Sequence, residues 1–211
     1  MRHLHRSAAI GLVALLLAGC FGAGATPGPT ESAAPPTSSA PATNEPPVSS
    51  QPSAEQVPSG DLEPFTCDLP IHEDATAPRV ANITDVRVGT HADYDRVVFE
   101  FEFADGLPEM TLDRAGPPFS EDGSGFPIEV DGASFLGLTM RGGTKQTEDG
   151  TSSYDGPTEF EPGFPSLVHL VEGGDFEAQS TWYFGLSSEA CVRVLTLTDD
   201  GAPRLVIDIE N

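Results

Sequence analysis

The sequence is poor in basic residues and in cysteine, and each shortage excludes a class of function. Its 211 residues hold 10 Lys and Arg against 33 Asp and Glu, for a formal net charge of -23. Such a surface is repelled by DNA, RNA and anionic lipid headgroups, so we expect no nucleic-acid partner and no electrostatic attachment to a membrane. There are three cysteines and no CxxC pair, so a redox-active thiol site is not expected.

Catalytic and metal-binding motifs are also missing. The sequence has no HExxH, no cysteine and histidine at zinc spacing, no Walker loop, no GxGxxG unit and no nucleophile elbow. Its Asp-Gly turns lack the ligand spacing of an EF-hand loop. We therefore expect no catalytic residue, no metal and no cofactor. One enzymatic alternative stays open, because a glycosidase-type pair of carboxylates cannot be recognised in so acidic a chain.

Long hydrophobic runs are absent as well, since a membrane-spanning helix needs roughly 20 apolar residues. The most apolar stretch, residues 8–17, follows a short basic region that contains Arg2 and Arg6. This arrangement fits the core of a secretory signal peptide, which is about 7–15 residues long. Residues 1–19 are therefore predicted to be a signal peptide.

The leader ends in Leu17, Ala18, Gly19 and Cys20, a run that resembles the lipobox of bacterial lipoproteins. The resemblance implies that Cys20 becomes the lipidated first residue of the mature chain. Two or more acyl chains hold a protein stably at a bilayer, whereas one holds it weakly. We expect a lipid-anchored protein on the outer face of the cell membrane. An ordinary signal peptide with an accidental cysteine is the alternative.

Residues 20–64 consist mostly of Ala, Pro, Ser, Thr and Gly, with a few isolated large apolar side chains. Such a segment cannot bury enough apolar surface to offset the entropy lost on ordering. It is predicted to be a disordered linker, stiffened by proline, which tethers the following domain to its anchor.

Residues 65–211 are predicted to form one domain with a two-residue alternation of side chains. Val97, Phe99, Phe101 and Phe103 share one face of an extended run. The fold class is all-β: a β-sandwich of about eight mainly antiparallel strands, with a small barrel as the alternative. The other strands are expected at residues 83–88, 110–114, 134–140, 167–171, 182–186, 192–197 and 205–209.

Turn signals divide these strands. Asp131-Gly132 lies between residues 128–130 and 134–140 and predicts a two-residue hairpin. Residues 142–165 show little pattern and are expected to be a long surface excursion.

With Cys20 lipidated, Cys67 and Cys191 remain as an even pair in an oxidising compartment, which predicts a disulfide between them. Two separate buried thiols are the alternative.

Five short motifs carry a family resemblance. The segments are TDVRVG at 84–89, YDRVVFEF at 94–101, GDFE at 174–177, TWYFGL at 181–186 and PRLVIDI at 203–209. Their succession resembles the AMIN-like domain of actinobacterial lipoproteins and, more distantly, the AMIN domain of cell-wall amidases and secretins. The resemblance implies a β-sandwich without chemistry of its own, which binds peptidoglycan or an envelope protein. No amidase or secretin domain follows in this sequence, so targeting of an attached enzyme is not expected.

Three residues are candidates for ligand contact. Tyr94 and Arg96 lie beside an acidic turn and could bind a glycan or a carboxylated peptide. The alternative, which we favour, is a cross-strand surface pair of Arg96 with Glu100 or Asp208. Tyr183 is expected on the exposed face of its strand, where it could stack on sugar, whereas the alternation places Trp182 in the core.

These observations lead to one functional expectation. The chain is predicted to be a membrane-anchored, extracytoplasmic lipoprotein whose non-catalytic β-sandwich binds peptidoglycan or an envelope protein. Two alternatives stay open: a cell-wall hydrolase with an acidic pair, and a solute-binding or sensory lipoprotein. The first needs a cleft with two carboxyl groups at hydrolase spacing. The second needs a deep pocket.

Overall fold

The computed structural model describes residues 62–77, 79–102, 106–198 and 201–211. The expected signal peptide, the lipobox residues, Cys20 and nearly all of the expected linker lie outside these residues, as does Phe103. Within the described ranges, no helix has the length and apolar character needed to cross a membrane.

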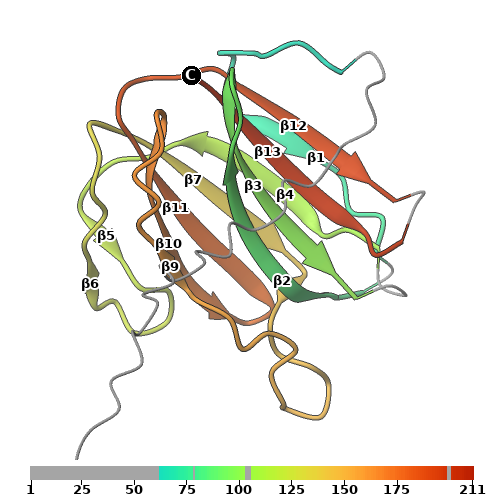
Figure 1. Ribbon diagram of the computed structural model, residues 1–211. Helices are drawn as coiled ribbons and strands as arrows, with labels where there is room; N and C mark the ends of the chain where they lie inside the picture. Colours follow the sequence, from blue (N-terminus) through green and yellow to red (C-terminus); the bar gives the residue numbers. More distant parts are fainter. Residues whose placement is uncertain (1–61, 78, 103–105, 199–200) are drawn as a thin grey trace, which may run out of the picture. The chain divides into compact units, whose positions relative to one another are not determined.

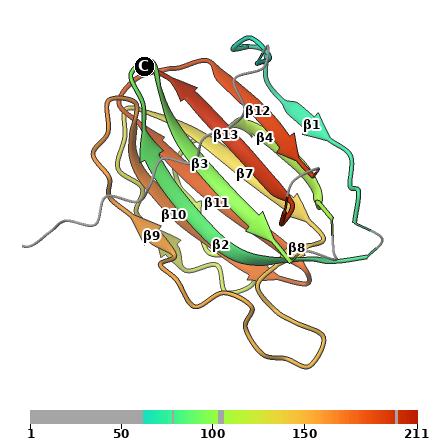
Figure 2. The same cartoon turned by 45° about the vertical axis from the view of Figure 1, so that its right-hand side comes forward.

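The described chain is all-β, and its two main sheets pack face to face as a sandwich (Figure 1). One sheet has the order β1-β4-β7-β11-β10-β9 and the other the order β12-β13-β3-β2-β8. Figure 2 shows β2, β3, β13 and β12 side by side in the nearer sheet. The strands are β1 (Ile71–Glu73), β2 (Ala81–Thr90), β3 (Tyr94–Phe101), β4 (Glu109–Arg114), β5 (Phe119–Ser120), β6 (Pro127–Ile128), β7 (Ser134–Arg141), β8 (Gly143–Thr144), β9 (Glu159–Phe160), β10 (Leu167–Phe176), β11 (Gln179–Leu186), β12 (Val192–Leu197) and β13 (Arg204–Glu210).

The predicted fold class is confirmed. Eight of the described strands have six or more residues. The pairings among the described strands are antiparallel, apart from the short parallel contact of β2 with β8. The remaining strands have two or three residues and lie at edges of the main sheets or, as β5 and β6, pair with each other.

The core lies between the two sheets and follows the alternation of the sequence. Val97, Phe99 and Phe101 of β3 are fully buried and point toward the opposite sheet. There the ring of Phe99 meets Trp182 of β11 edge-on, with ring centroids 5.3 Å apart. The Trp182 indole donates a hydrogen bond of 2.9 Å to the Ser180 hydroxyl, so its one polar atom is satisfied. The prediction that Trp182 belongs to the core is confirmed.

The segment before β1 joins the two sheets along one side. Cys67 and Cys191 form the predicted disulfide. Next to it, the backbone of Thr66 exchanges hydrogen bonds of 2.8 and 2.9 Å with Val192 at the start of β12. A few residues later β1 pairs with β4, at the edge of the other sheet. The chain therefore passes from one sheet to the other. It pairs along the edge of β4 and satisfies the backbone groups of Val192 at the start of β12.

The predicted hairpin at Asp131-Gly132 is wrong. β6 pairs with β5, and β7 pairs with β4 and β11. Instead of turning back on itself, the chain here lies against β11, and a side chain at Gly132 would come within 2.8 Å of the Leu186 nitrogen. The backbone N–H of Asp131 donates to Nδ1 of His169 at 3.0 Å. Glycine is needed at this point for close backbone packing, and its conformational freedom is not used for a turn.

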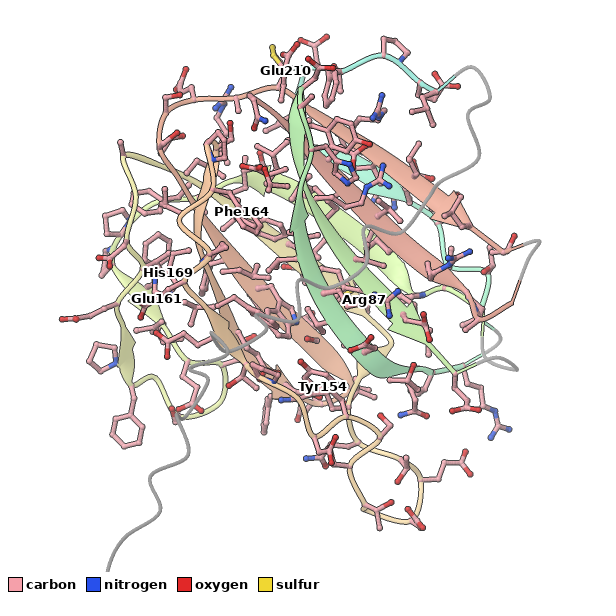
Figure 3. All side chains as sticks on the ribbon, in the orientation of Figure 1. Arg87, Tyr154, Glu161, Phe164, His169 and Glu210 are labelled. Atoms are coloured by element: carbon pink, nitrogen blue, oxygen red, sulfur yellow. A yellow bond between two sulfur atoms is a disulfide. The ribbon has the colours of Figure 1, made fainter. Side chains whose placement is uncertain are left out.

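Residues 142–165 are only partly the surface excursion that we expected. They contain β8 and β9, and Tyr154 between them is buried against the core. The Tyr154 hydroxyl donates to the Pro157 carbonyl at 2.7 Å, and burial raises its pKa to about 12. The loop after β8 projects from the end of the sandwich in Figure 1, and Figure 3 places Tyr154 at its base. A buried aromatic residue therefore anchors the loop.

Candidate functional site

Two grooves meet at the tip of the β10–β11 hairpin. The larger has a volume of about 680 Å³ and the smaller about 350 Å³. Phe176 and Glu177 line both, so the hairpin tip is the wall between them. We call the two together the hairpin grooves. The larger groove is lined by Arg79, Val80, Asn82, Thr144, Gln146, Thr147, Glu148, Asp175, Phe176, Glu177 and Ala178, and the smaller by Asp122, Gly123, Arg141, Phe176, Glu177 and Gln179.

The hairpin tip has an unusual backbone. Glu177 and Ala178 connect the two strands, and both have positive φ, at 52° and 58°. A type I′ turn requires this conformation, which normally selects Asn-Gly because it costs other residues about 1–2 kcal/mol each. The strand pairing of Phe176 with Gln179 continues up to the turn and holds it in place. Backbone strain of this kind concentrates at functional sites.

Phe176 is a large apolar side chain that the fold leaves in solvent. It is 52% exposed although it stands at the end of a long paired strand. One side of its ring lies against Gly123, where an added Cβ would come within 3.0 Å of the ring. The ring is thus supported from one side, while the rest of it is open to the hairpin grooves.

The opposite wall of the larger groove is the loop after β8, and the adjoining strands hold it. The Asp175 carboxylate accepts a hydrogen bond of 2.6 Å from the Thr144 hydroxyl and one of 2.5 Å from the backbone N–H of Lys145. The Asn82 amide donates to the Gln146 carbonyl at 2.9 Å. Because both walls are tied to paired strands, the groove is formed before any ligand arrives, which lowers the entropic cost of binding.

A buried carboxylate lies near this wall without reaching the grooves. The Glu172 side chain is 9% exposed, and its Oε2 forms an ion pair with Nζ of Lys145 at 2.5 Å. Burial raises the pKa of Glu172, partly offset by Lys145, and within the described residues its second oxygen has no hydrogen-bond partner. A raised pKa suits a general acid, but Glu172 lines neither groove. The arrangement gives no support to an acidic-pair hydrolase at this site.

Each hairpin groove contains one exposed arginine. Arg79 lines the larger groove, and Arg141 lines the smaller one with a side chain that is 72% exposed. Arg141 lies 3.6 Å from Glu109 at the surface, a pairing that contributes little in water. Most of the other basic side chains in the described chain are held by carboxylates closer than this, as Lys145 is by Glu172. Arg79 and Arg141 are therefore available to a ligand.

Arg96, one of the residues proposed from sequence, is buried in an ion cluster. Its Nε lies 2.6 Å from Oδ1 of Asp208, and Nη2 of Arg193 lies 2.5 Å from the other oxygen of the same carboxylate. The favoured pairing of Arg96 with Asp208 is confirmed, but the expectation of a surface pair is wrong, because Arg96 is 2% exposed and Asp208 0%. Aromatic rings cover the cluster: Phe65 over Arg193 at 4.5 Å and Tyr94 over Arg96 at 5.0 Å.

Tyr94 is half-buried and belongs to this cover. Its ring stacks on His91 with centroids 4.4 Å apart. Burial and the charge of Arg96 lower the pKa of His91. Tyr94 and Arg96 line neither hairpin groove. Their contacts account for both side chains structurally, and a role for them in ligand binding stays a prediction.

Tyr183 is less exposed than the alternation suggested. Its ring is half-buried beneath Phe119 of β5, with centroids 4.7 Å apart, and lies beside the unsubstituted backbone of Gly173. Burial and the charge of Asp122 raise its pKa. The open aromatic side chains here are Phe126, at 69%, and Phe176. A binding role for Tyr183 stays a prediction. Sequence reasoning missed Phe176 because no turn residue marks its hairpin.

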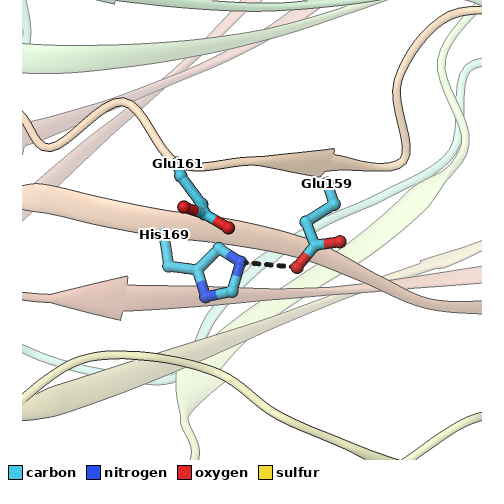
Figure 4. Close-up of side chains that lie close together, drawn as sticks. All are labelled: Glu159, Glu161 and His169. Carbon is cyan, nitrogen blue, oxygen red and sulfur yellow. Dashed lines mark hydrogen bonds and ion pairs between the residues drawn. The ribbon is translucent and has the colours of Figure 1, made fainter.

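A group of potential metal ligands lies at the β9 edge of the β1-β4-β7-β11-β10-β9 sheet (Figure 4). Side-chain atoms of Glu159, Glu161 and His169 lie within 4.8 Å of one another. Nδ1 of His169 accepts the N–H of Asp131, so in the neutral ring the proton is on Nε2, which faces Glu159 at 3.2 Å. That nitrogen has no lone pair to offer a cation. The geometry therefore favours a packed strand histidine over a metal ligand.

Comparisons with known proteins agree with the motifs. No curated protein and no solved structure matches the chain. A family model, the AMIN-like domain, matches residues 81–211, which is more than half of the sequence. The match begins at β2 and ends at the last residue, so it includes every described strand except β1 and every residue lining the hairpin grooves except Arg79 and Val80. The chain belongs to the AMIN-like domain family.

Proposed function

We propose that this domain binds peptidoglycan without chemical change and that the hairpin grooves are its binding site. Membership of the AMIN-like family supports an envelope-associated binding domain outside the cytoplasm. The observation that carries the site is Phe176, an exposed aromatic residue standing between two preformed grooves. Ligand sites commonly combine an apolar surface with a few polar groups, in clefts of about 300–1,000 Å³.

The proposal includes the way in which the protein is held. Residues 1–19 are removed as a signal peptide, Cys20 carries lipid, and residues 20–64 tether the binding domain at 65–211. The lipobox-like run ending at Cys20 and the composition of the linker support this. Metabolic labelling with palmitate tests it: wild type incorporates label in the membrane fraction, and Cys20→Ala does not. Unlabelled wild type in the culture fluid contradicts the anchor.

A pull-down with purified peptidoglycan tests the binding function. The chain from residue 21 onward, without lipid, is expected to sediment with the polymer. The Phe176→Ala variant should bind at least tenfold more weakly, because the exposed ring is the main apolar contact of the site. Phe126→Ala is the matched control, since Phe126 is more exposed and lines neither hairpin groove. Lack of retention of the wild-type chain at low and moderate salt contradicts the function.

A partner protein of the envelope is the second candidate. It is favoured by a groove of about 450 Å³ beside β5 and β6, whose lining includes Pro117, Pro118 and Phe135. Substitution of Phe135 does not touch the hairpin grooves, so it separates the two sites. Peptidoglycan binding that survives Phe135→Ala and is lost in Phe176→Ala assigns the wall polymer to the hairpin grooves.

A further inference from the structure

We infer that the hairpin grooves bind the neutral glycan backbone of the wall polymer rather than its peptide stems, with Phe176 as a stacking surface between two sugar subsites. This inference rests on the proposed function and names the part of the ligand that is recognised. It begins from the shape of the site. Two grooves that share a wall, formed by Phe176 and Glu177, suit an extended chain that crosses the hairpin tip, with one segment on each side of it.

The chemistry of the central residue fits a sugar ring. A Phe ring offers an apolar face and no hydrogen-bonding group, so it binds the C–H face of a pyranose and does not select charged groups. Around it stand side chains with planar polar ends, Gln146 on one side and Gln179 on the other. Side-chain amides can both donate to and accept from hydroxyl and acetamido groups, and the guanidinium groups of Arg79 and Arg141 can donate to them.

The charge of the site argues against a carboxylate-rich peptide. Among the described residues that line the two grooves, Arg79 and Arg141 are the only basic ones, and they stand beside four carboxylates. The excess is therefore negative, and an anionic peptide entering the site meets repulsion. A neutral saccharide avoids that cost. The four acidic side chains are Asp122, Glu148, Asp175 and Glu177.

Two of these carboxylates are already occupied by the protein. Asp175 accepts from Thr144 and Lys145, and Asp122 accepts a 2.6 Å hydrogen bond from the Thr181 hydroxyl. They set the position of the groove walls. Glu148 and Glu177 are exposed and have free acceptor capacity for sugar hydroxyls. The ligand groups that fit are thus hydrogen-bond donors without negative charge.

Competition between defined fragments tests the inference. The lipid-free chain from residue 21 is bound to intact peptidoglycan and challenged with three competitors. They are glycan strands freed of their peptides and amidated at the lactyl carboxyl groups that this exposes, so that the strands are neutral; isolated stem peptides; and β-1,4-linked N-acetylglucosamine oligomers. Free glycan strands are expected to compete within about threefold of intact polymer, and stem peptides to compete at least tenfold less well. Binding to the free strands should change less than about twofold between low and moderate salt, because no ion pair holds a neutral ligand.

Variants connect the ligand to the site. Phe176→Ala should weaken binding to free glycan strands at least tenfold, Phe176→Trp should restore it, and Phe126→Ala should leave it unchanged. The restoring variant shows that Phe176 acts through its aromatic face, whatever Phe176→Ala does to folding. Stem peptides that compete fully while free strands do not would overturn the glycan inference and leave the wall-binding function intact. Glycan binding that survives in Phe176→Ala overturns the site.

Discussion

At the scale of single residues, the most consequential contact is one carboxylate shared by two buried arginines. Asp208 receives Arg96 and Arg193 on the outer face of the β12–β13–β3 sheet, under the rings of Phe65 and Tyr94. Bringing three charges out of water is costly, so the cluster is stable only while opposite charges compensate each other. Removing the Asp208 carboxylate alone should therefore cost more stability than the complete cluster contributes to the fold.

We predict that Asp208→Asn lowers the free energy of unfolding by about 3–5 kcal/mol, because two buried guanidinium groups lose their shared anion. Urea denaturation followed by Trp182 fluorescence measures it. The matched control is Glu100→Gln, which removes a half-exposed partner of Arg87 at 3.1 Å in the same sheet and should cost about 1 kcal/mol or less. Equal losses in the two variants contradict the account of a buried cluster.

A second residue-scale prediction concerns acid. Hydrogen bonds from the hydroxyls of Thr147 and Thr151 lower the pKa of Asp149 to about 2. A lowered folded-state pKa stabilises the loop above the unfolded value, near 4, and this contribution is lost as pH falls through about 2. An NMR titration of the Asp149 carboxyl should show that midpoint. In Thr147→Val with Thr151→Val it should return toward the ordinary value, and an unchanged midpoint contradicts the cause.

At the scale of elements, the sequence was informative wherever alternation coincided with burial. The run from Val97 to Phe101 predicted a strand and its buried face, and the structure has both. Turn chemistry was less reliable. Asp131-Gly132 carries the residues of a hairpin and forms none, whereas Glu177-Ala178 lacks them and forms a two-residue hairpin. Contacts from distant strands decide both cases, and no local pattern records them.

The same reason explains why the candidate site was not found from sequence. Phe176 occupies an inconspicuous strand end, and the loop that faces it follows β8, about 30 residues earlier in the chain. Arg96 and Tyr94 attracted notice because an arginine and a tyrosine beside an acidic turn fit a ligand site. In the structure Arg96 is buried and the Tyr94 ring covers it, so both side chains stabilise the fold. A two-residue alternation does not predict that a side chain on the outer face of a sheet is buried.

The strained turn yields an element-scale prediction. Ala178→Gly removes the Cβ that opposes positive φ, so it should raise the free energy of unfolding by about 1 kcal/mol. The Ala178 carbonyl accepts the N–H of Gly142 at 2.8 Å, and the substitution leaves this bond in place. Thermal unfolding measures the change. Ala133→Gly, outside the positive-φ region, is the control and should be neutral or destabilising. A loss of stability in Ala178→Gly contradicts the strain.

At the scale of the whole molecule, the net charge limits how the protein can be attached and what it can bind. The excess of 23 negative charges keeps the chain soluble and away from anionic surfaces, so attachment and recognition must come from elsewhere. The proposed lipid at Cys20 supplies attachment without charge, and the hairpin grooves supply an uncharged aromatic contact. An acidic module of this kind approaches a neutral polysaccharide more readily than a polyanion, which agrees with the glycan inference.

The disulfide is the whole-molecule device that protects this arrangement in an oxidising compartment. Cys67 and Cys191 are 124 residues apart, so the bond restricts most of the unfolded domain. Loop-closure entropy predicts a contribution of about 4–5 kcal/mol to the free energy of unfolding, and removal of a native disulfide typically costs about 2–5 kcal/mol.

Cys67→Ser with Cys191→Ser should lower the free energy of unfolding by about 2–5 kcal/mol, measured by urea denaturation. Release of Thr66 from Val192 also frees the backbone groups at the start of β12, so the variant should aggregate more readily at high concentration. Peptidoglycan binding by the fraction that remains folded should be unchanged, because neither cysteine lines the hairpin grooves. A variant that keeps its stability contradicts the constraint, and one that stays folded but loses binding contradicts the separation of the disulfide from the site.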